Sequence, residues 1–196
     1  MERTVAVAIL NWNGREHLRT YLPSVIEHSK EAVVYVIDND STDDSIEVLK
    51  NEFPSVKIIQ NSSNTGFAGG YNEGLRSIKE DYYILLNSDV EVSPNWIGPI
   101  IDLMESDPSI SIAQPKILSY REKNRFEYAG AAGGFIDYLG YPFCRGRIFQ
   151  DLEEDKGQYN DTTEVFWATG ACMFIRSELF WQLEGFDERY FAHMEE

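Results

Sequence analysis

In Tyr82-Tyr-Ile-Leu-Leu-Asn-Ser-Asp89, a short apolar run leads directly into polar side chains and a carboxylate. A run without apolar–polar alternation is typical of a strand that is buried on both faces of a parallel sheet. Comparable runs occur at Val5–Leu10, Val33–Ile37 and Val56–Ile59. The sequence therefore predicts an α/β fold with a mostly parallel central sheet.

Helical spacing of apolar residues separates these strands. Residues three or four positions apart share one helix face in three places: Leu18, Leu22, Val25 and Ile26; Ile46, Leu49 and Phe53; and Tyr71, Leu75 and Ile78. Ser41 and Asp44 match a capping box before the second of these helices. A fourth helix is expected to begin at Ser93-Pro94. Alternation of strands and helices predicts right-handed crossovers, with helices on both faces of the sheet.

The remainder of the chain is less regular. We expect a strand within Ile110–Leu118, and then loops with short strands through Ser119–Glu164. Further strands are expected at Val165–Trp167 and Ala171–Ile175, followed by a short helix near Ser177–Leu183.

Composition excludes several classes of protein. The chain has 17 Lys plus Arg against 33 Asp plus Glu, and its net charge of −16 disfavours binding to nucleic acid. Cys144 and Cys172 are far apart, so neither a disulfide framework nor a zinc knuckle is expected. No apolar run approaches the roughly 20 residues that span a bilayer. We expect a cytoplasmic protein and leave open its association with the inner face of the membrane.

Polar residues follow each of the first four apolar runs. The segments are Asn11-Trp-Asn-Gly14, Asp38-Asn-Asp-Ser-Thr-Asp-Asp44, Asn61-Ser-Ser-Asn-Thr-Gly66 and Asn87-Ser-Asp89. Each segment alone is also what a turn requires. However, the carboxyl ends of parallel strands meet at one edge, where open α/β sheets bind their ligands. The four segments together predict a binding site.

The chemistry of that site is narrowed by what the sequence lacks. It has no G-x-G-x-x-G turn, no P-loop and no G-x-S-x-G elbow, which disfavours dinucleotide dehydrogenases, P-loop enzymes and α/β-hydrolases. Asp89 is a hard oxygen donor that suits Mg²⁺ or Mn²⁺ shared with a diphosphate. Asp38 can accept hydrogen bonds from a base or a ribose, so its loss is expected to weaken binding and leave stability almost unchanged. The alternative is a turn carboxylate, a role that Ser41 fills equally well.

Six motifs occur in order along nearly the whole chain. They are Leu10-Asn-Trp-Asn-Gly14, Ile37-Asp-Asn-Asp-Ser-Thr-Asp43, Asn64-Thr-Gly-Phe-Ala-Gly-Gly-Tyr-Asn72, Leu86-Asn-Ser-Asp89, Trp167-Ala-Thr-Gly-Ala-Cys172, and Gly185-Phe-Asp-Glu188 through Glu196. This set resembles the family 2 glycosyltransferases of GT-A fold, notably their rhamnosyltransferase-like branch. The resemblance implies a metal-dependent, inverting transfer of a sugar from a nucleotide diphosphate to an acceptor hydroxyl. It further implies a glycan or lipid-linked acceptor in surface polysaccharide or cell-wall biosynthesis.

The resemblance also implies roles for individual residues. The nucleotide-binding set is Asn11, Asp38, Asn64, Gly66, Asn87 and Asp89. Asp89 matches the last residue of the metal-binding D-x-D motif, which reads Asn87-Ser88-Asp89 here. The family's Glu-Asp pair matches Glu195-Glu196, and we expect Glu196 to be the general base, with Glu195 as the second choice. His193 is a weaker candidate for a metal ligand.

We interpret residues 1–196 as a single GT-A catalytic domain. Residues 1–118 form its nucleotide-sugar half, and residues 119–196 form an acceptor-side half that is expected to be truncated at its C-terminal end. Aromatic residues of the second half suit sugar faces, or else a second small core or a protein interface: Tyr120, Phe126, Tyr128, Phe135, Tyr138, Tyr141, Phe143 and Phe149. Arg145 and Arg147 suit an anionic acceptor.

Two alternatives and one open question accompany this interpretation. A sugar nucleotidyltransferase shares a similar core but needs a Gly-rich, basic loop after the first strand, and Asn11-Trp-Asn-Gly14 is not such a loop. A non-catalytic module that binds nucleotide sugars is the second alternative. The oligomeric state is left open.

Overall fold

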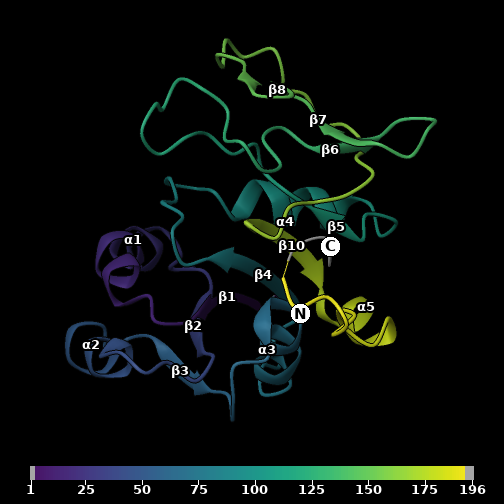
Figure 1. Cartoon of the computed structure of the whole chain (residues 1–196). Helices are drawn as coiled ribbons and strands as arrows, with labels where there is room; N and C mark the ends of the chain where they lie inside the picture. Colours follow the sequence, from purple (N-terminus) through teal and green to yellow (C-terminus); the bar gives the residue numbers. More distant parts are fainter. Residues whose placement is uncertain (1–2, 193–196) are drawn as a thin grey trace.

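The central sheet of the computed structural model, which describes residues 3–192, contains six strands in the order β3-β2-β1-β4-β10-β5 (Figure 1). The parallel part consists of β1 (Val5–Asn11), β2 (Val33–Asp38), β3 (Lys57–Gln60) and β4 (Tyr82–Asn87). Strand β10 (Cys172–Arg176) is antiparallel to β4, and β5 (Ile112–Ala113) is antiparallel to β10. The prediction of a mostly parallel sheet is confirmed.

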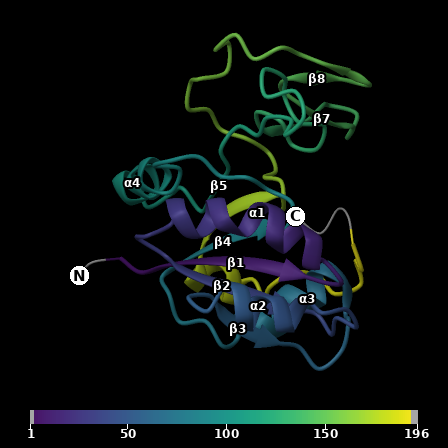
Figure 2. The ribbon, with the colours of Figure 1, turned by 90° about the vertical axis from the view of Figure 1, so that its left-hand side faces the viewer.

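Helices cover both faces of this sheet, as predicted (Figure 2). The helices are α1 (Arg15–His28), α2 (Ser45–Glu52), α3 (Gly66–Leu75), α4 (Gly98–Ser106) and α5 (Ser177–Gln182). One apolar core lies between the sheet and α1, α2 and α4, and a second lies between the sheet and α3 and α5. Successive residues of β1 alternate between the two cores, with Val5 and Val7 in the first and Ala6 and Ala8 in the second. Burial on both sides explains the unbroken apolar runs.

The strand order creates a switch point between β1 and β4. The chain extends the sheet from β1 through β2 to β3, and then crosses to the other side of β1 to form β4. In the register, Asn11 is paired with Asp38, and its neighbour Leu10 is paired with Asn87. The last residues of three strands therefore lie side by side at the edge where such sheets bind ligands.

A second sheet of four short strands stands apart from the first, on the side of α1 and α4 (Figures 1 and 2). It consists of β6 (Gly134–Ile136), β7 (Pro142–Cys144), β8 (Arg147–Ile148) and β9 (Asp151–Leu152), in that order. Beneath it is a small core of Phe126, Ala131, Ala132 and Cys144. The chain then returns to the main sheet through β10. Within residues 3–192, no helix combines the length and the apolar character needed to cross a membrane.

Several local predictions are wrong for identifiable reasons. Helix α4 begins at Gly98 and not at Ser93, because Asn95 has φ +59, a left-handed conformation that interrupts a helix. The capping box is absent, since α2 begins at Ser45 and the Ser41 hydroxyl accepts hydrogen bonds from elsewhere. Only Ile112–Ala113 of the strand expected within Ile110–Leu118 forms. The strand expected at Val165–Trp167 is reduced to one bridge between Trp167 and Gly134.

Candidate functional site

The carboxylate at the end of β2 is buried and braced from two sides. Asp38 is 2% exposed and Asn11 is 0% exposed. The Asn11 Nδ2 donates to Asp38 Oδ1 at 3.0 Å, and the Ser41 backbone N–H donates to Asp38 Oδ2 at 3.0 Å. Two of the roughly four acceptor positions of the carboxylate are thus used within the protein. Asp38 supports the loop after β2, as in the turn alternative, and its contact with a ligand stays a prediction.

Asn11 presents an acceptor that has no partner among the described atoms. Its Nδ2 donates to both Asp38 and the Ser41 hydroxyl, but its buried Oδ1 accepts no hydrogen bond. A side chain at Gly14 would overlap this oxygen, and the same Cβ position lies 3.9 Å from Ser88 Oγ. Because an unsatisfied buried acceptor is costly, this oxygen, which lies close to the Asn87-Ser88-Asp89 turn, is a candidate contact for a ligand.

The loop before α3 is tied to the loop after β2 by amides. The Asn39 Nδ2 donates to Asn64 Oδ1 and to the Gly66 carbonyl, both at 2.9 Å, and the Gly66 N–H also donates to Asn64 Oδ1. Gly66 has φ +75, which favours glycine. The structure thus brings Asn64 and Gly66 to the same edge as Asp38. Sequence analysis missed Asn39, although its position directly after Asp38 was a signal.

Asn87 and Asp89 line a cavity of about 630 Å³ that extends between the main sheet and the second half of the chain. Its other walls include Tyr21 of α1 and the segment 115–129. Glu127 also lines this cavity, and sequence analysis missed it because no motif or spacing marks a lone Glu in an irregular segment. Burial raises the pKa of the Glu127 carboxyl, and the negative charge of Asp89 contributes to the rise. Two carboxyl groups, those of Asp89 and Glu127, therefore line this cavity.

The donor set at Asp89 fits a divalent cation that a ligand completes. Asp89 offers a carboxylate and Asn87 an amide oxygen, and both line the same cavity. Within the described residues no group of three or more His, Cys, Asp or Glu side chains could hold a metal ion. Mg²⁺ is commonly held by one or two carboxylates together with substrate phosphates and waters. The residues therefore suit a cation shared with a diphosphate.

Lys116, Lys123 and Arg121 line the cavity, and the two lysines are held in ion pairs. Lys116 Nζ contacts Asp155 at 2.6 Å, and Lys123 pairs with Glu91. Arg145, a predicted acceptor contact, is instead held inside the second half by Asp161 at 3.2 Å. The guanidinium of Arg147 lies over the Tyr128 ring, 4.1 Å from its centroid, and Tyr128 lines the cavity. Of the two predicted arginines, Arg147 is the one beside the cavity.

The aromatic residues of the second half serve more than one purpose. Phe126 is buried in the small core, which agrees with the second-core interpretation. Tyr120 and Tyr128 line the cavity, as expected of residues that face a sugar. Tyr138 is 94% exposed at the tip between β6 and β7. Neither the sugar faces nor the second core accounts for the whole set, and the interface interpretation stays a prediction for the exposed rings.

The segment that precedes the predicted catalytic pair in the sequence packs against α3. His193, Glu195 and Glu196 lie outside the described residues. Just before them, the Phe191 carbonyl accepts a 2.7 Å hydrogen bond from the Phe67 N–H in the first turn of α3. Gly66, from the predicted nucleotide-binding set, is in contact with Phe191, so the described chain ends beside the candidate site.

Comparisons with known proteins agree with this geometry. The model of the family described as glycosyl transferase family 2 matches residues 6–184. The N-acetylglucosaminyl-diphospho-decaprenol L-rhamnosyltransferase of Mycobacterium tuberculosis is 26% identical over 215 residues, an alignment that covers 100% of this chain and 69% of that protein.

Solved structures show a similar fold. The mannosyltransferase PcManGT from Pyrobaculum calidifontis, in complex with GDP-Man and Mn²⁺, has a TM-score of 0.64 and 14% identity over 95% of this chain. GalNAc-T7 with UDP, GalNAc and Mn²⁺ has a TM-score of 0.67 and 21% identity, also over 95% of this chain. The alignments cover 48% and 37% of those two chains, so this chain spans half their length or less.

Proposed function

The chain belongs to glycosyl transferase family 2, and we propose that it transfers a sugar from a nucleotide diphosphate to an acceptor hydroxyl with inversion. The family and the GT-A fold expected from the sequence are confirmed. The proposed acceptor is a glycan or lipid-linked sugar of cell-wall or surface polysaccharide biosynthesis. This choice is supported by the similarity to a rhamnosyltransferase named for a diphospho-decaprenol acceptor.

The observation that carries the proposal is the row formed by Asn11, Asp38 and Asn87 at the switch point of the sheet. We assign the nucleoside to Asp38 and the unsatisfied oxygen of Asn11, where carbonyl and carboxylate acceptors face base N–H groups or ribose hydroxyls. Asn64 and Gly66 complete the wall of this site. The diphosphate then extends towards Asn87 and Asp89.

Asp89, with Asn87 beside it, would hold the Mg²⁺ or Mn²⁺ ion. A bound divalent cation supplies positive charge that offsets the repulsion between the diphosphate and an acidic protein. This charge matters here because the chain carries −16 overall and the nearby lysines Lys116 and Lys123 are already paired. The Mn²⁺ in the two structural relatives supports this assignment.

The cavity beyond Asp89 is proposed to receive the acceptor. Its rings Tyr21, Tyr120 and Tyr128 suit the apolar faces of a sugar, and Glu127 can accept a hydrogen bond from a hydroxyl. In this view residues 1–118 form the nucleotide-sugar half of one domain. Residues 119–196 then form the acceptor side, apart from β10, which belongs to the main sheet, and α5, which packs against that sheet.

Glu196 is proposed as the general base, with Glu195 as the second choice. A base must come within hydrogen-bond reach of the acceptor hydroxyl. Phe191 is fixed beside Gly66, and Glu196 follows five positions later, within about 18 Å of extended chain. That span is compatible with delivery of the carboxylate to the site.

The experiment that tests the donor site is calorimetry of nucleoside diphosphates and nucleotide sugars with and without Mn²⁺, using the protein and its Asp89→Ala variant. We expect Mn²⁺ to strengthen binding in the unaltered protein and to have no effect in Asp89→Ala. Asp102→Ala on the exposed surface of α4 is the matched control and should behave as the unaltered protein. Equal diphosphate affinity in Mn²⁺ and in chelator would contradict the metal assignment.

A transfer assay separates catalysis from binding alone. Release of nucleoside diphosphate that depends on an added acceptor supports the glycosyltransferase. Tight nucleotide-sugar binding without any such release, across a panel of glycan and lipid-linked acceptors, supports the alternative of a non-catalytic binding module.

A further inference from the structure

Asn72 holds the segment 185–192 through three hydrogen bonds. This residue lies in α3 and is 3% exposed. Its Nδ2 donates to the Phe186 carbonyl at 2.9 Å and to Glu188 Oε1 at 3.0 Å. Its Oδ1 accepts from the Phe186 N–H at 2.9 Å. One side chain thus binds both backbone groups of Phe186 and the carboxylate two residues later.

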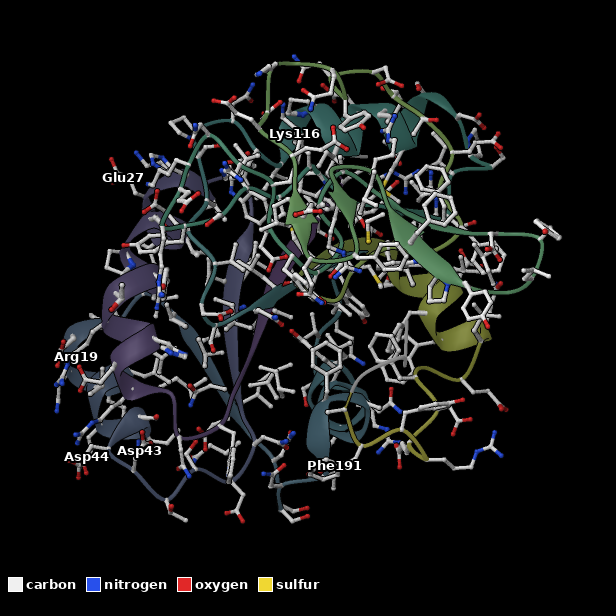
Figure 3. The ribbon with its side chains drawn as sticks, turned by 45° about the horizontal axis from the view of Figure 1, so that its top comes forward. Arg19, Glu27, Asp43, Asp44, Lys116 and Phe191 are labelled. Atoms are coloured by element: carbon white, nitrogen blue, oxygen red, sulfur yellow. The ribbon has the colours of Figure 1, made fainter. Side chains whose placement is uncertain are left out.

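The backbone of segment 185–192 also lies close to α3, which reinforces its attachment through Asn72. Gly185 has φ +79, and a Cβ at this position would overlap Asn72 Oδ1. The Phe186 ring lies 5.9 Å from the Phe67 ring and 6.4 Å from the Tyr71 ring, measured between centroids. Figure 3 shows Phe191 next to α3, where its carbonyl accepts from the Phe67 N–H. The whole segment therefore follows one helix.

The same helix is attached to the candidate nucleotide site at its first turns. The Gly66 carbonyl accepts from Asn39, and the Gly70 carbonyl accepts from Asn61 Nδ2 at 2.9 Å. Gly66 also contacts Phe191. Helix α3 is thus a rigid link between the loop that follows Asp38 and the chain that leads to Glu195 and Glu196.

We propose that Asn72 is a positioning residue for the transfer reaction: it fixes segment 185–192 on α3 and thereby sets where the following Glu195-Glu196 pair meets the bound donor and acceptor. This inference rests on the proposed function. Asn72 touches neither nucleotide nor acceptor in this scheme. Its loss should misplace the base and leave the nucleotide side of the site intact, and small misplacements of reacting groups are costly to rate.

The test is an Asn72→Asp variant of the full chain, with Glu188→Gln as a partner change. The introduced carboxylate keeps an acceptor for the Phe186 N–H, loses both donated bonds, and places its charge against Glu188. We expect kcat to fall about 10- to 100-fold while the Kd of the donor stays within about twofold. In the double variant, the amide introduced at position 188 can donate to the carboxylate at position 72, so part of the lost kcat should return.

Ser29→Ala is the matched control, because it removes a buried hydroxyl that accepts from Trp96 Nε1 and has no contact with segment 185–192. It should lower stability without changing kcat at a temperature where it is folded. An Asn72→Asp protein with unchanged kcat would overturn the inference. So would a Glu188→Gln change that gives no recovery.

Hydrogen exchange gives a readout that does not depend on activity. In Asn72→Asp, and in Asn72→Ser as a smaller side chain, the backbone amides of segment 185–192 and of Phe67 should exchange faster. Amides of β1 and β2 should be unaffected. If the unaltered protein transfers no sugar, the proposed function fails. Independently of activity, unchanged exchange rates of segment 185–192 in both variants would show that Asn72 does not hold this segment.

Discussion

Replacement of Asp38 tests how one carboxylate divides its role between loop support and ligand binding. Asp38→Ala deletes the acceptors of two hydrogen bonds, one from Asn11 Nδ2 and one from the Ser41 N–H. Sequence analysis predicts weakened nucleotide binding with stability almost unchanged. The burial of Asp38, at 2% exposed, contradicts the second half of that prediction.

The expected loss of stability follows from these contacts. A hydrogen bond to a charged group contributes about 1.5–3 kcal/mol, so two bonds set an upper range of about 3–6 kcal/mol. Two effects reduce this value. Asn11 Nδ2 keeps its second partner, the Ser41 hydroxyl at 3.2 Å, and the Ser41 N–H lies in a half-buried loop that water can reach. We therefore expect Asp38→Ala to unfold with a free energy lower by about 2–3 kcal/mol.

Urea unfolding at pH 7 measures this difference, and Glu47→Ala on the exposed face of α2 is the control that should change little. Calorimetry below the unfolding temperature should separately show nucleotide affinity reduced by about 1–3 kcal/mol. A variant as stable as the unaltered protein would refute the bracing role of Asp38. Lowered stability with normal affinity would refute its assignment to the nucleoside.

Three further predictions concern the general base, the Asp155–Lys116 ion pair at the cavity wall, and Cys172. Glu196→Gln should bind the donor normally and lose about 10²–10⁴-fold in the rate of transfer, and Glu195→Gln should lose less. Normal turnover in both variants would exclude both residues as the general base. The hydrogen bond from Lys116 holds the pKa of Asp155 below its usual range, so Asp155→Asn should lower stability at pH 7 by about 1 kcal/mol in this partly exposed pair. The ion pair's contribution to the free energy of unfolding is complete above the ordinary Asp pKa and is lost as pH falls through the lowered pKa of Asp155. Urea unfolding should therefore show a smaller stability difference between the unaltered protein and Asp155→Asn at pH 3 than at pH 7. An equal difference at both pH values would contradict the pairing. Burial raises the pKa of the Cys172 thiol, so a disulfide reagent at pH 8 should label it only as urea unfolds the chain, and rapid labelling of the folded protein would contradict its burial.

The layer architecture was predictable because burial on both faces leaves a direct trace in the sequence. Strand β4 reads as an unbroken apolar run, since Ile84 and Leu86 face one core and Tyr83 and Leu85 face the other. Helix α1 follows the spacing of Leu18, Leu22 and Val25 as expected, and all three are buried. Side-chain periodicity carries this information without any knowledge of distant contacts.

Local boundaries and the irregular half were less predictable because their causes are non-local. Asn95 has a positive φ, and the next residue, Trp96, is bound through its Nε1 to Ser29 on the connection after α1. Ser41 matches a helix cap in sequence, yet Asn11 from another strand competes for its hydroxyl. Glu127 reaches the cavity only because the chain folds back over β4. No local pattern encodes these contacts.

The asparagines at the carboxyl edge of the sheet show why polarity alone overstates a binding site. An amide side chain carries two N–H donors on one atom and an acceptor on another, so a single Asn can connect two loops in a way that the acceptor-only carboxylate of Asp cannot. Asn39 joins the loop after β2 to Asn64, and Asn72 joins α3 to the segment that follows Gly185. These residues are used for internal bonds. Asn11 and Asn61 differ from these two because each leaves a buried Oδ1 without a partner among the described residues, and in Asn11 that oxygen lies beside the Asn87-Ser88-Asp89 turn, where a ligand has reason to bind.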